Sequence, residues 1–289
     1  MKIVISGASG LVGSRLAKGL AERGDTVVPL GRSDGWDPVS GLAPAEALAG
    51  ADAVVHLAGE NIAQRWSAAA RERIRESRVA GTANLVAGIE ATQPRPRVLL
   101  CANAVGYYGN RGDELLSERS RPGEDWLATV CVEWEKAATN AAALGLRVCV
   151  LRTGVVLDRH GGALAKMLPA FRAGAGGPVA GGRQWISWIG ADDLVALYIA
   201  ALDDERFDGP INAVAPQAVR NADFSHALGR ALHRPAFAPV PGVAMRLLFG
   251  DMAAIVTDSQ HVVPDRAQEL GFRFTRPELD AALADALSQ

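Results

Sequence analysis

The sequence has few cysteines, no marked excess of either charge and no long apolar run. Its 289 residues contain three cysteines, and 30 lysines and arginines stand against 32 aspartates and glutamates. Because the two signs are scattered along the chain, there is no basic stripe of the kind that nucleic-acid binding needs. The apolar runs stay well short of the roughly 20 residues of a membrane-spanning helix. We therefore expect neither a nucleic acid nor a membrane as partner.

The three cysteines are too few and too far apart to form a framework. Cys101 and Cys149 lie in apolar runs, and Cys131 lies in a predicted helix. We interpret all three as buried, reduced thiols, and no cluster has the spacing of a metal site. Because the first two residues lead directly into an apolar strand, we expect no signal peptide and a cytoplasmic location.

A glycine-rich turn near the N-terminus is the strongest functional signal. The apolar run 2–6 leads into Gly7, Gly10 and Gly13, and apolar residues then recur at helical spacing between positions 12 and 20. Gly7 permits a sharp turn, Gly10 lets the backbone approach a pyrophosphate, and Gly13 lets the helix pack closely on the strand. The free N–H groups at the start of the helix then face the phosphates. The pattern predicts a dinucleotide site.

The residues after the second predicted strand indicate which dinucleotide binds. Residues 26–30 form this strand, and we expect it to end early because Pro29 cannot donate a ladder hydrogen bond. An acidic residue after the strand would bind the adenosine ribose, whereas an arginine pairs with a 2′-phosphate. The sequence has Arg32 followed by Ser33, which favours NADP(H) over NAD(H). An ordinary solvated arginine remains the alternative.

Strands and helices alternate through the first half of the chain. We expect strands at 52–59, 98–102 and 146–151, and helices at 68–92 and 125–143. This alternation predicts an α/β fold with a Rossmann-like, doubly wound parallel sheet.

Residues at the carboxyl ends of such strands line the ligand crevice. We therefore expect Leu57, Ala58 and Gly59 to contact the cofactor, and we interpret His56 as a packed core residue. Arg78 begins the half of its helix that should lie under the cofactor.

The chain divides into two predicted parts. Residues 1–155 form the dinucleotide-binding domain, to which 184–215 return. Residues 156–183 and 216–289 form a smaller substrate lobe, with a C-terminal domain at 240–289. Within the returning segment, tryptophans are more typical of a core than of a substrate platform, but Trp185 follows the polar Gln184 near the expected crevice and is the candidate to face it.

Several segments together resemble the extended short-chain dehydrogenases/reductases. They are the N-terminal turn, the strand 52–59, Gly81-Thr82, Tyr107-Tyr108-Gly109 and the segment 151–154. Residues 161–167, 184–189 and 247–250 resemble one atypical branch, the epimerase-family proteins with a C-terminal domain of unknown function. The resemblance runs essentially from end to end. The residues predicted to bind the cofactor are Gly7, Ser9, Gly10, Leu11, Val12, Gly13, Arg32, Ser33, Leu57, Ala58, Gly59, Arg78 and Glu135.

The chain departs from this family in its proton-transfer residues. Family members use a serine or threonine after the strand that precedes the catalytic helix, and a Tyr-x-x-x-Lys on that helix. The matching positions here are Asn103, Cys131 and Glu135. Asn103 can donate a hydrogen bond but cannot relay a proton, and Glu135 can accept hydrogen bonds from ribose hydroxyls. Cys131 is shorter than tyrosine, and a nearby carboxylate keeps it protonated.

Three explanations of this departure remain open. Tyr107 or Tyr108 supplies the acid from the loop, or only a hydride is transferred, or the protein binds the dinucleotide without turnover. The resemblance thus implies an NADP(H)-dependent oxidoreductase or epimerase-like enzyme for a small polar substrate, with Asn103, Tyr107, Cys131 and Trp185 around the pocket. The alternative is a non-catalytic, dinucleotide-binding regulator, as relatives associated with cell division imply. A homodimer is left open.

Overall fold

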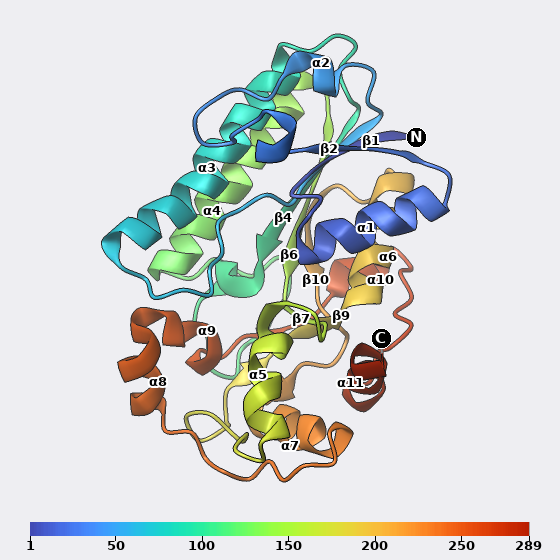
Figure 1. Ribbon diagram of the computed structural model, residues 1–289. Helices are drawn as coiled ribbons and strands as arrows, with labels where there is room; N and C mark the ends of the chain where they lie inside the picture. The colour runs from blue at the N-terminus through green and yellow to red at the C-terminus, as the bar shows by residue number, and fades with distance from the viewer. Residues whose placement is uncertain (289) are drawn as a thin grey trace.

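Six parallel strands form the central sheet of the computed structural model, which describes residues 1–288. Their order across the sheet is β10-β6-β4-β3-β1-β2 (Figure 1). The chain moves outward from β1 to β2 and then returns to the other side of β1, so the topological switch point lies between β1 and β3. The bounds are β1 (Lys2–Ser6), β2 (Thr26–Leu30), β3 (Ala53–His56), β4 (Val98–Ala104), β6 (Arg147–Thr153) and β10 (Gly209–Ala213).

Helices cover both faces of this sheet (Figure 1). On one face lie α1 (Leu11–Glu22) and α6 (Ala191–Asp203), and on the other lie α3 (Ala68–Glu90) and α4 (Trp126–Thr139). Since parallel sheets are buried on both faces, their strands read as nearly continuous apolar runs, as β3 and β4 do here. The predicted Rossmann-like, doubly wound fold is confirmed.

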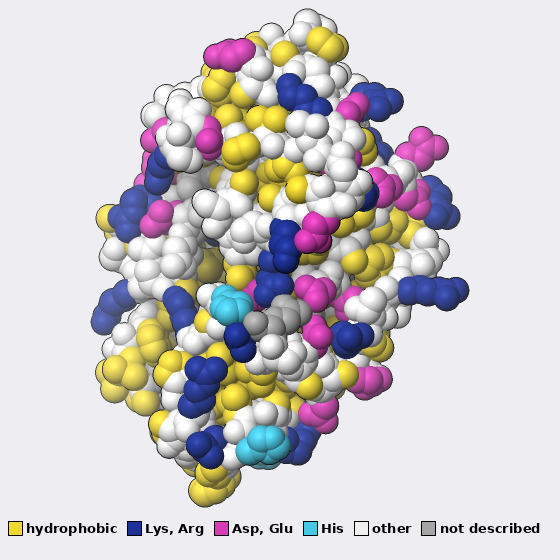
Figure 2. All heavy atoms as spheres, turned by 45° about the vertical axis from the view of Figure 1, so that its right-hand side comes forward, with side chains coloured by type: hydrophobic (Ala, Val, Ile, Leu, Met, Phe, Trp, Pro, Cys, Tyr) yellow, Lys and Arg dark blue, Asp and Glu magenta, His cyan; other side chains and the backbone are white. Residues whose placement is uncertain are grey.

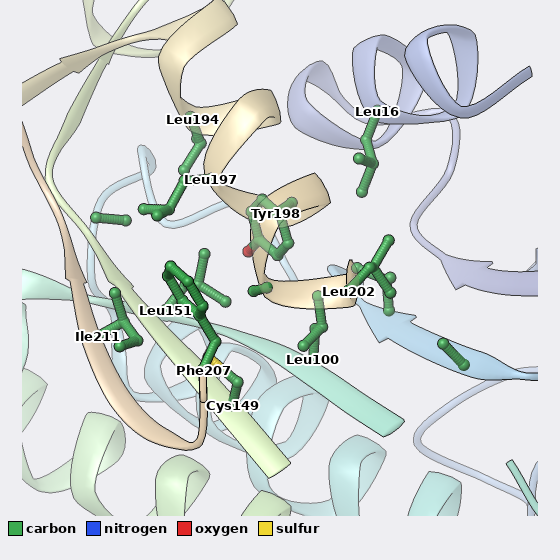
Figure 3. Packing of buried hydrophobic residues seen from close by; sticks show 14 of the residues in the cluster. Leu16, Leu100, Cys149, Leu151, Leu194, Leu197, Tyr198, Leu202, Phe207 and Ile211 are labelled. Atoms are coloured by element: carbon green, nitrogen blue, oxygen red, sulfur yellow. The ribbon is translucent and has the colours of Figure 1, made fainter. Parts of the chain in front are cut away.

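The core beneath α1 and α6 fixes these helices on the sheet (Figure 3). Leu16 of α1 and Leu197 of α6 are fully buried, and Leu100 of β4 and Leu151 of β6 lie among the same cluster of side chains. Burial of apolar surface stabilises such a layer by roughly 25 cal/mol per Å². The core therefore holds the carboxyl ends of the strands at a fixed height relative to the start of α1.

The rest of the chain forms a smaller lobe below the carboxyl ends of the strands (Figure 1). Its core joins α5 (Gly162–Arg172), α7 (Asn221–Ala231) and α11 (Leu279–Ser288). Short strand pairs connect it to the sheet: β7 (Val155–Leu157) with β9 (Trp188–Gly190), β8 (Trp185–Ile186) with β11 (Val219–Arg220), and β5 (Leu115–Leu116) with β12 (His261–Val262). The remaining helices are α2 (Ala45–Leu48), α8 (Gly242–Phe249), α9 (Ala254–Thr257) and α10 (Asp265–Glu269).

Several element boundaries differ from those expected from the sequence; β3, for example, ends at His56 rather than at residue 59. The early end of the second strand was wrong, because β2 continues through Pro29, which pairs with Ile5. As the edge strand, β2 bonds on one side only and so tolerates a residue without an N–H. β4 extends beyond its expected end and includes Asn103. The expected strand at 184–189 is divided into β8 and β9.

The surface in Figure 2 carries basic and acidic side chains intermixed with apolar and neutral ones, without a continuous basic stripe. Cys101, Cys131 and Cys149 are all buried and free. Among residues 1–288, no group of three or more potential ligand side chains is placed to hold a metal ion. No helix in the same part of the chain is long and apolar enough to cross a membrane.

We predict that Leu197→Ala lowers the free energy of unfolding by about 2–5 kcal/mol, because it leaves a cavity in a fully buried layer. Leu42→Ala is the matched control, since Leu42 is 58% exposed and should change stability by less than about 0.5 kcal/mol. Urea unfolding followed by circular dichroism measures both. Equal effects of the two substitutions would contradict this assignment of the core.

Candidate functional site

The turn between β1 and α1 is held so closely that it excludes side chains. Gly7 has a φ of +75°, and a Cβ there would lie 2.8 Å from the backbone nitrogen of Ala58. A Cβ on Gly13 would lie 2.1 Å from the carbonyl oxygen of Gly7. Gly10 is the N-cap residue of α1, and no side chain forms a capping hydrogen bond there. The first N–H groups of α1 are therefore directed at the crevice, where they can bind an anion.

A cavity of about 510 Å³ lies over this turn, at the switch point of the sheet. Three segments supply most of its lining: the turn itself, the end of β2 with the residues that follow, and the residues after β3. Ser77 of α3 also lines it. The structure brings eight of the predicted cofactor residues together here. They are Gly7, Ser9, Gly10, Arg32, Ser33, Leu57, Ala58 and Gly59.

Arg32 lies at this cavity with most of its side chain in solvent. The side chain is 71% exposed, and Nε lies 3.5 Å from an Asp37 carboxylate oxygen. An exposed pair of this kind contributes little to stability, so the guanidinium is available to a ligand. Ser33 lies beside it and donates a hydrogen bond to Asp34.

Arg78 and Gly13 support the cavity, and neither is among its lining residues. The Arg78 guanidinium donates to the carbonyl oxygens of Glu60 and Ile74, both at 3.1 Å. It also lies directly against Gly59, where an added Cβ would come within 3.4 Å of Cζ. Burial lowers the pKa of Arg78. The structure thus places Arg78 behind the segment that follows β3, where it fixes that segment, and direct contact with a cofactor stays a prediction.

His56 is a packed core residue, as expected. Its ring is fully buried, and Nδ1 lies 2.5 Å from the hydroxyl oxygen of Ser6. No partner of Nε2 is found among the described residues. Burial, reinforced by the charge of Arg78, lowers the pKa of His56 to about 4. The imidazole is therefore neutral at physiological pH.

The second half of the crevice is built at the ends of β4 and β6. Asn103 of β4 is paired in register with Arg152 of β6. The Asn103 amide donates to the Cys131 carbonyl oxygen at 3.0 Å and to Glu135 Oε2 at 3.3 Å. Both acceptors lie on α4, so this amide ties the strand to the helix.

Glu135 is engaged by an arginine that the sequence did not single out. Arg152 donates from Nε to Oε2 at 2.9 Å and from Nη2 to Oε1 at 2.7 Å. The arginine side chain is 2% exposed and that of Glu135 is 17% exposed. A bidentate hydrogen-bonded ion pair of this kind is strong and directional. The available signal was a charged residue near the carboxyl end of an otherwise apolar, buried strand, because an arginine there must find a partner.

The two tyrosines of the loop have different surroundings. Tyr108 is fully buried, donates to Asn212 Oδ1 at 2.6 Å and receives a bond from Arg152 Nη1 at 3.0 Å. Burial raises its pKa to about 12. Tyr107 is half-buried, and its ring centroid lies 3.5 Å from Cζ of Arg152. Burial raises the pKa of Tyr107 as well.

Cys131 lies next to this loop, beneath Gly106. A Cβ on Gly106 would come within 3.6 Å of the sulfur. Burial raises the pKa of Cys131 to about 12, so the thiol stays protonated at neutral pH. Asn103, Tyr107 and Cys131 are thus neighbours at one end of the sheet, and their catalytic roles stay predictions.

Trp185 does not offer a free ring face. His261 stacks on it with centroids 3.9 Å apart and planes 11° apart, and Cζ of Arg220 lies 4.0 Å from the same ring. Two groups at these distances require opposite faces of the ring. Its Nε1 donates to Asp113. The expectation that Trp185 presents a face to the crevice is therefore wrong, and the residue fastens β8 to β12.

A glycine-rich turn under a cavity at the switch point of a parallel sheet defines a Rossmann-type dinucleotide-binding protein. A model of the NAD dependent epimerase/dehydratase family matches residues 3–213, and one of a domain of unknown function (DUF1731) matches residues 240–286. The chain belongs to the NAD dependent epimerase/dehydratase family. The predicted resemblance to its atypical branch with a C-terminal domain of unknown function is confirmed.

Relatives match along the whole chain. The Arabidopsis thaliana protein named epimerase family protein SDR39U1 homolog, chloroplastic, is 40% identical over 289 residues, or 95% of this chain and 83% of the relative. Epimerase family protein Mb2239 of Mycobacterium bovis is 38% identical, covering 99% and 98% of the two chains. The crystal structure of human epimerase family protein SDR39U1 (isoform 2) with NADPH has a TM-score of 0.91 and 32% identity and covers 100% of both chains. Since one relative is named chloroplastic, the cytoplasmic location stays a prediction.

We predict that Gly13→Ala lowers the free energy of unfolding by about 1–3 kcal/mol, because the new Cβ forces the turn away from the Gly7 carbonyl. Gly19→Ala in the same helix is the control. Its Cβ would lie at an ordinary 3.6 Å from Val195, and alanine favours a helix over glycine by roughly 0.5–1 kcal/mol. Thermal unfolding measures both, and a tolerated Gly13→Ala would refute the close approach.

Acid should destabilise the protein through His56. Its ordinary pKa is 6.5 and its folded pKa is about 4, so between these values the unfolded chain binds more protons. Stability is therefore lost as pH falls from about 6.5 toward 4, by on the order of 3 kcal/mol. His56→Asn should lose less stability across this window. Urea unfolding at several pH values measures the difference, and identical slopes for the two proteins would rule out the buried neutral imidazole.

Proposed function

We propose that the chain is an NADP(H)-binding oxidoreductase or epimerase-like enzyme that transfers a hydride to or from a small polar substrate. The observation that carries this proposal is the cavity over the β1–α1 turn, with an exposed arginine at the end of β2. Gly31 and Arg32 follow β2 directly, so the first charged side chain after the strand is a guanidinium rather than the carboxylate that binds an unphosphorylated ribose. The Asp34 carboxylate, which also lines the cavity, comes two residues later. The human relative was crystallised with NADPH, which supports the same choice.

The residues present fit this cofactor. The turn at Gly7 and Gly13 leaves no room for side chains, so backbone N–H groups can approach a pyrophosphate. Arg32 would hold the 2′-phosphate, and the Ser33 hydroxyl lies beside it as a further hydrogen-bonding group. Ala58 and Gly59 are small enough to let the dinucleotide cross the strand ends toward β4.

The chain's own residues would bind and orient the substrate. When bound, NADPH supplies a hydride to an electrophilic carbon. Asn103 and Arg152 are paired in register near the carboxyl ends of β4 and β6. Because β4 is the neighbour of β3 in the sheet, the reacting carbon would lie near these two residues when the dinucleotide extends from β3 toward β4. Tyr107 lies in the 3₁₀ turn that directly follows β4. The smaller lobe lies below the carboxyl ends of the strands (Figure 1), on the side where the substrate would bind.

A non-catalytic, dinucleotide-binding regulator is the second candidate. It is favoured by the internal engagement of the residues at the family's catalytic positions. Asn103 and Glu135 bond to protein groups, and the Cys131 thiol stays protonated. None of these features disfavours binding of the dinucleotide, so the two candidates share the same cofactor site.

Fluorescence of NADPH separates the two candidates. The protein is first titrated with NADPH to establish binding and is then supplied with a panel of aldehydes, ketones and nucleotide sugars. Oxidation of the cofactor coupled to one compound supports the enzyme. Tight binding without turnover across the panel supports the regulator. Absence of binding contradicts both.

We predict that Arg32→Ala weakens NADPH binding roughly 10- to 100-fold, since a charged hydrogen bond contributes about 1.5–3 kcal/mol. NADH binding should change little, because NADH lacks the 2′-phosphate. Arg97→Ala is the control, as Arg97 is 81% exposed and lies at the opposite ends of the strands. Fluorescence titration gives the affinities of the wild type and both variants for NADPH and NADH, and an unchanged preference in Arg32→Ala would remove the basis for naming NADP(H).

A further inference from the structure

The ring of Tyr107 lies on the guanidinium of Arg152. The distance from Cζ to the ring centroid is 3.5 Å, well inside the range in which a cation is attracted to an aromatic face. Tyr107 belongs to the 3₁₀ turn Val105–Tyr108 that directly follows β4, so it stands at the carboxyl edge of the sheet. The side chain is half-buried.

Arg152 is held in place by hydrogen bonds from all three nitrogens of its side chain. Nε and Nη2 bind the two oxygens of Glu135, and Nη1 binds the hydroxyl oxygen of Tyr108. Asn103 donates to the same carboxylate and holds it in turn. The guanidinium therefore presents one face to Tyr107 without freedom to rotate away, which is the preorganisation that a catalytic group requires.

We propose that Tyr107 is the proton donor of the reaction and that Arg152, held by Glu135, is its positioning residue. The pair would replace the family's tyrosine and lysine with residues that come from a loop and a strand rather than from one helix. This inference rests on the proposed hydride-transfer function and names the acid that this function lacks.

The neighbouring groups are less suited to this role. The Tyr108 hydroxyl is buried and already joins Asn212 to Arg152. The Cys131 thiol is buried with a pKa of about 12. The Asn103 amide has no acidic proton to give. Tyr107 alone in this group combines an acidic hydroxyl, partial exposure and a neighbouring cation.

The proton and electron balance is simple in the reductive direction. When bound, NADPH gives a hydride to the carbonyl carbon and becomes NADP⁺, and the π-electron pair moves to the carbonyl oxygen. That oxygen takes the hydroxyl proton of Tyr107, which leaves a phenolate over the Arg152 guanidinium. Water returns a proton to the phenolate. The guanidinium stabilises the charge that develops on Tyr107 in this step.

Two charged groups act on Tyr107 from the elements around it. Arg152 of β6 favours the phenolate and lowers the pKa of Tyr107, while Glu135 of α4 disfavours the phenolate and raises this pKa. Neutralising the carboxylate should therefore strengthen the tyrosine as an acid. Glu135→Gln keeps the shape of the side chain and one oxygen that accepts from Arg152.

The test follows the ionisation of each tyrosine by NMR. The chain has only three tyrosines, so labelling with ¹³Cζ-tyrosine gives three resonances, which Tyr107→Phe and Tyr198→Phe assign. Tyr107 should ionise first, because burial raises the pKa of Tyr108 to about 12 and that of Tyr198 well above its ordinary value. In Glu135→Gln, the ionisation constant of Tyr107 should rise roughly tenfold, and that of the control residue Tyr198 should stay unchanged.

The same samples report whether Tyr107 faces the nicotinamide. Only the oxidised ring carries a positive charge, so saturating NADP⁺ should lower the pKa of Tyr107 below its value with NADPH. Equal values with the two forms overturn the donor role, and an unchanged value in Glu135→Gln overturns the positioning role. If Glu135→Gln does not fold, the comparison of NADP⁺ with NADPH in the wild type decides.

NADPH binding, measured in parallel, separates failure of this inference from failure of the proposed function. Tyr107→Phe should bind NADPH within about twofold of the wild type, because Tyr107 does not lie at the adenosine end of the cavity. Binding with an indifferent Tyr107 overturns the inference alone. A wild-type protein that does not bind NADPH overturns both.

Discussion

The close contact between Gly7 and Gly13 is the constraint on which the rest of the site depends. A single added carbon at Gly13 would fall 2.1 Å from the Gly7 carbonyl oxygen, so α1 can approach β1 only where side chains are absent. This approach aims the N–H groups of α1 at the crevice and sets the depth of the cavity. The buried layer beneath α1 and α6 then holds the helix at that height. The turn, α1 and the buried layer beneath it therefore hold one another in position.

A second constraint, the ion pair between Glu135 and Arg152, organises the other half of the crevice. Removal of two charges from water is costly, and a buried pair repays the cost only when its remaining donors are also satisfied. Here Nη1 of Arg152 donates to the Tyr108 hydroxyl and to the Glu118 carbonyl oxygen, and the ring of Tyr107 lies over the guanidinium. The ion pair therefore fixes the geometry of this part of the crevice more than it adds to the net stability of the fold. It connects β6, α4 and the loop after β4 at the place where the reaction would occur.

Much of the fold and the adenosine end of the site could be predicted from the sequence because their signals are local. The glycine spacing, the alternation of strands and helices and the arginine after β2 are each contained in a few consecutive residues. Pro29 misled the prediction because only the strand order shows that β2 is an edge. Asn103 was predicted to follow its strand, whereas it lies within β4.

The part of the crevice at the ends of β4 and β6 was harder to predict because its contacts join distant segments. Arg152 and Glu135 are 17 residues apart, and nothing in either segment shows that they meet. Trp185 was expected to face the crevice, but its ring lies between Arg220 and His261, which come from two other elements. Such contacts depend on tertiary packing, so local sequence patterns do not predict them.

We expect one phosphorylated dinucleotide to bind across the carboxyl edge of the sheet. Isothermal titration of the purified protein with NADPH, repeated in the presence of adenosine 2′,5′-bisphosphate, tests this binding most directly. We expect one saturable site per chain, for which the bisphosphate competes because it carries the 2′-phosphate that Arg32 would hold. No saturable heat of binding, or binding that the bisphosphate leaves unchanged, would contradict it.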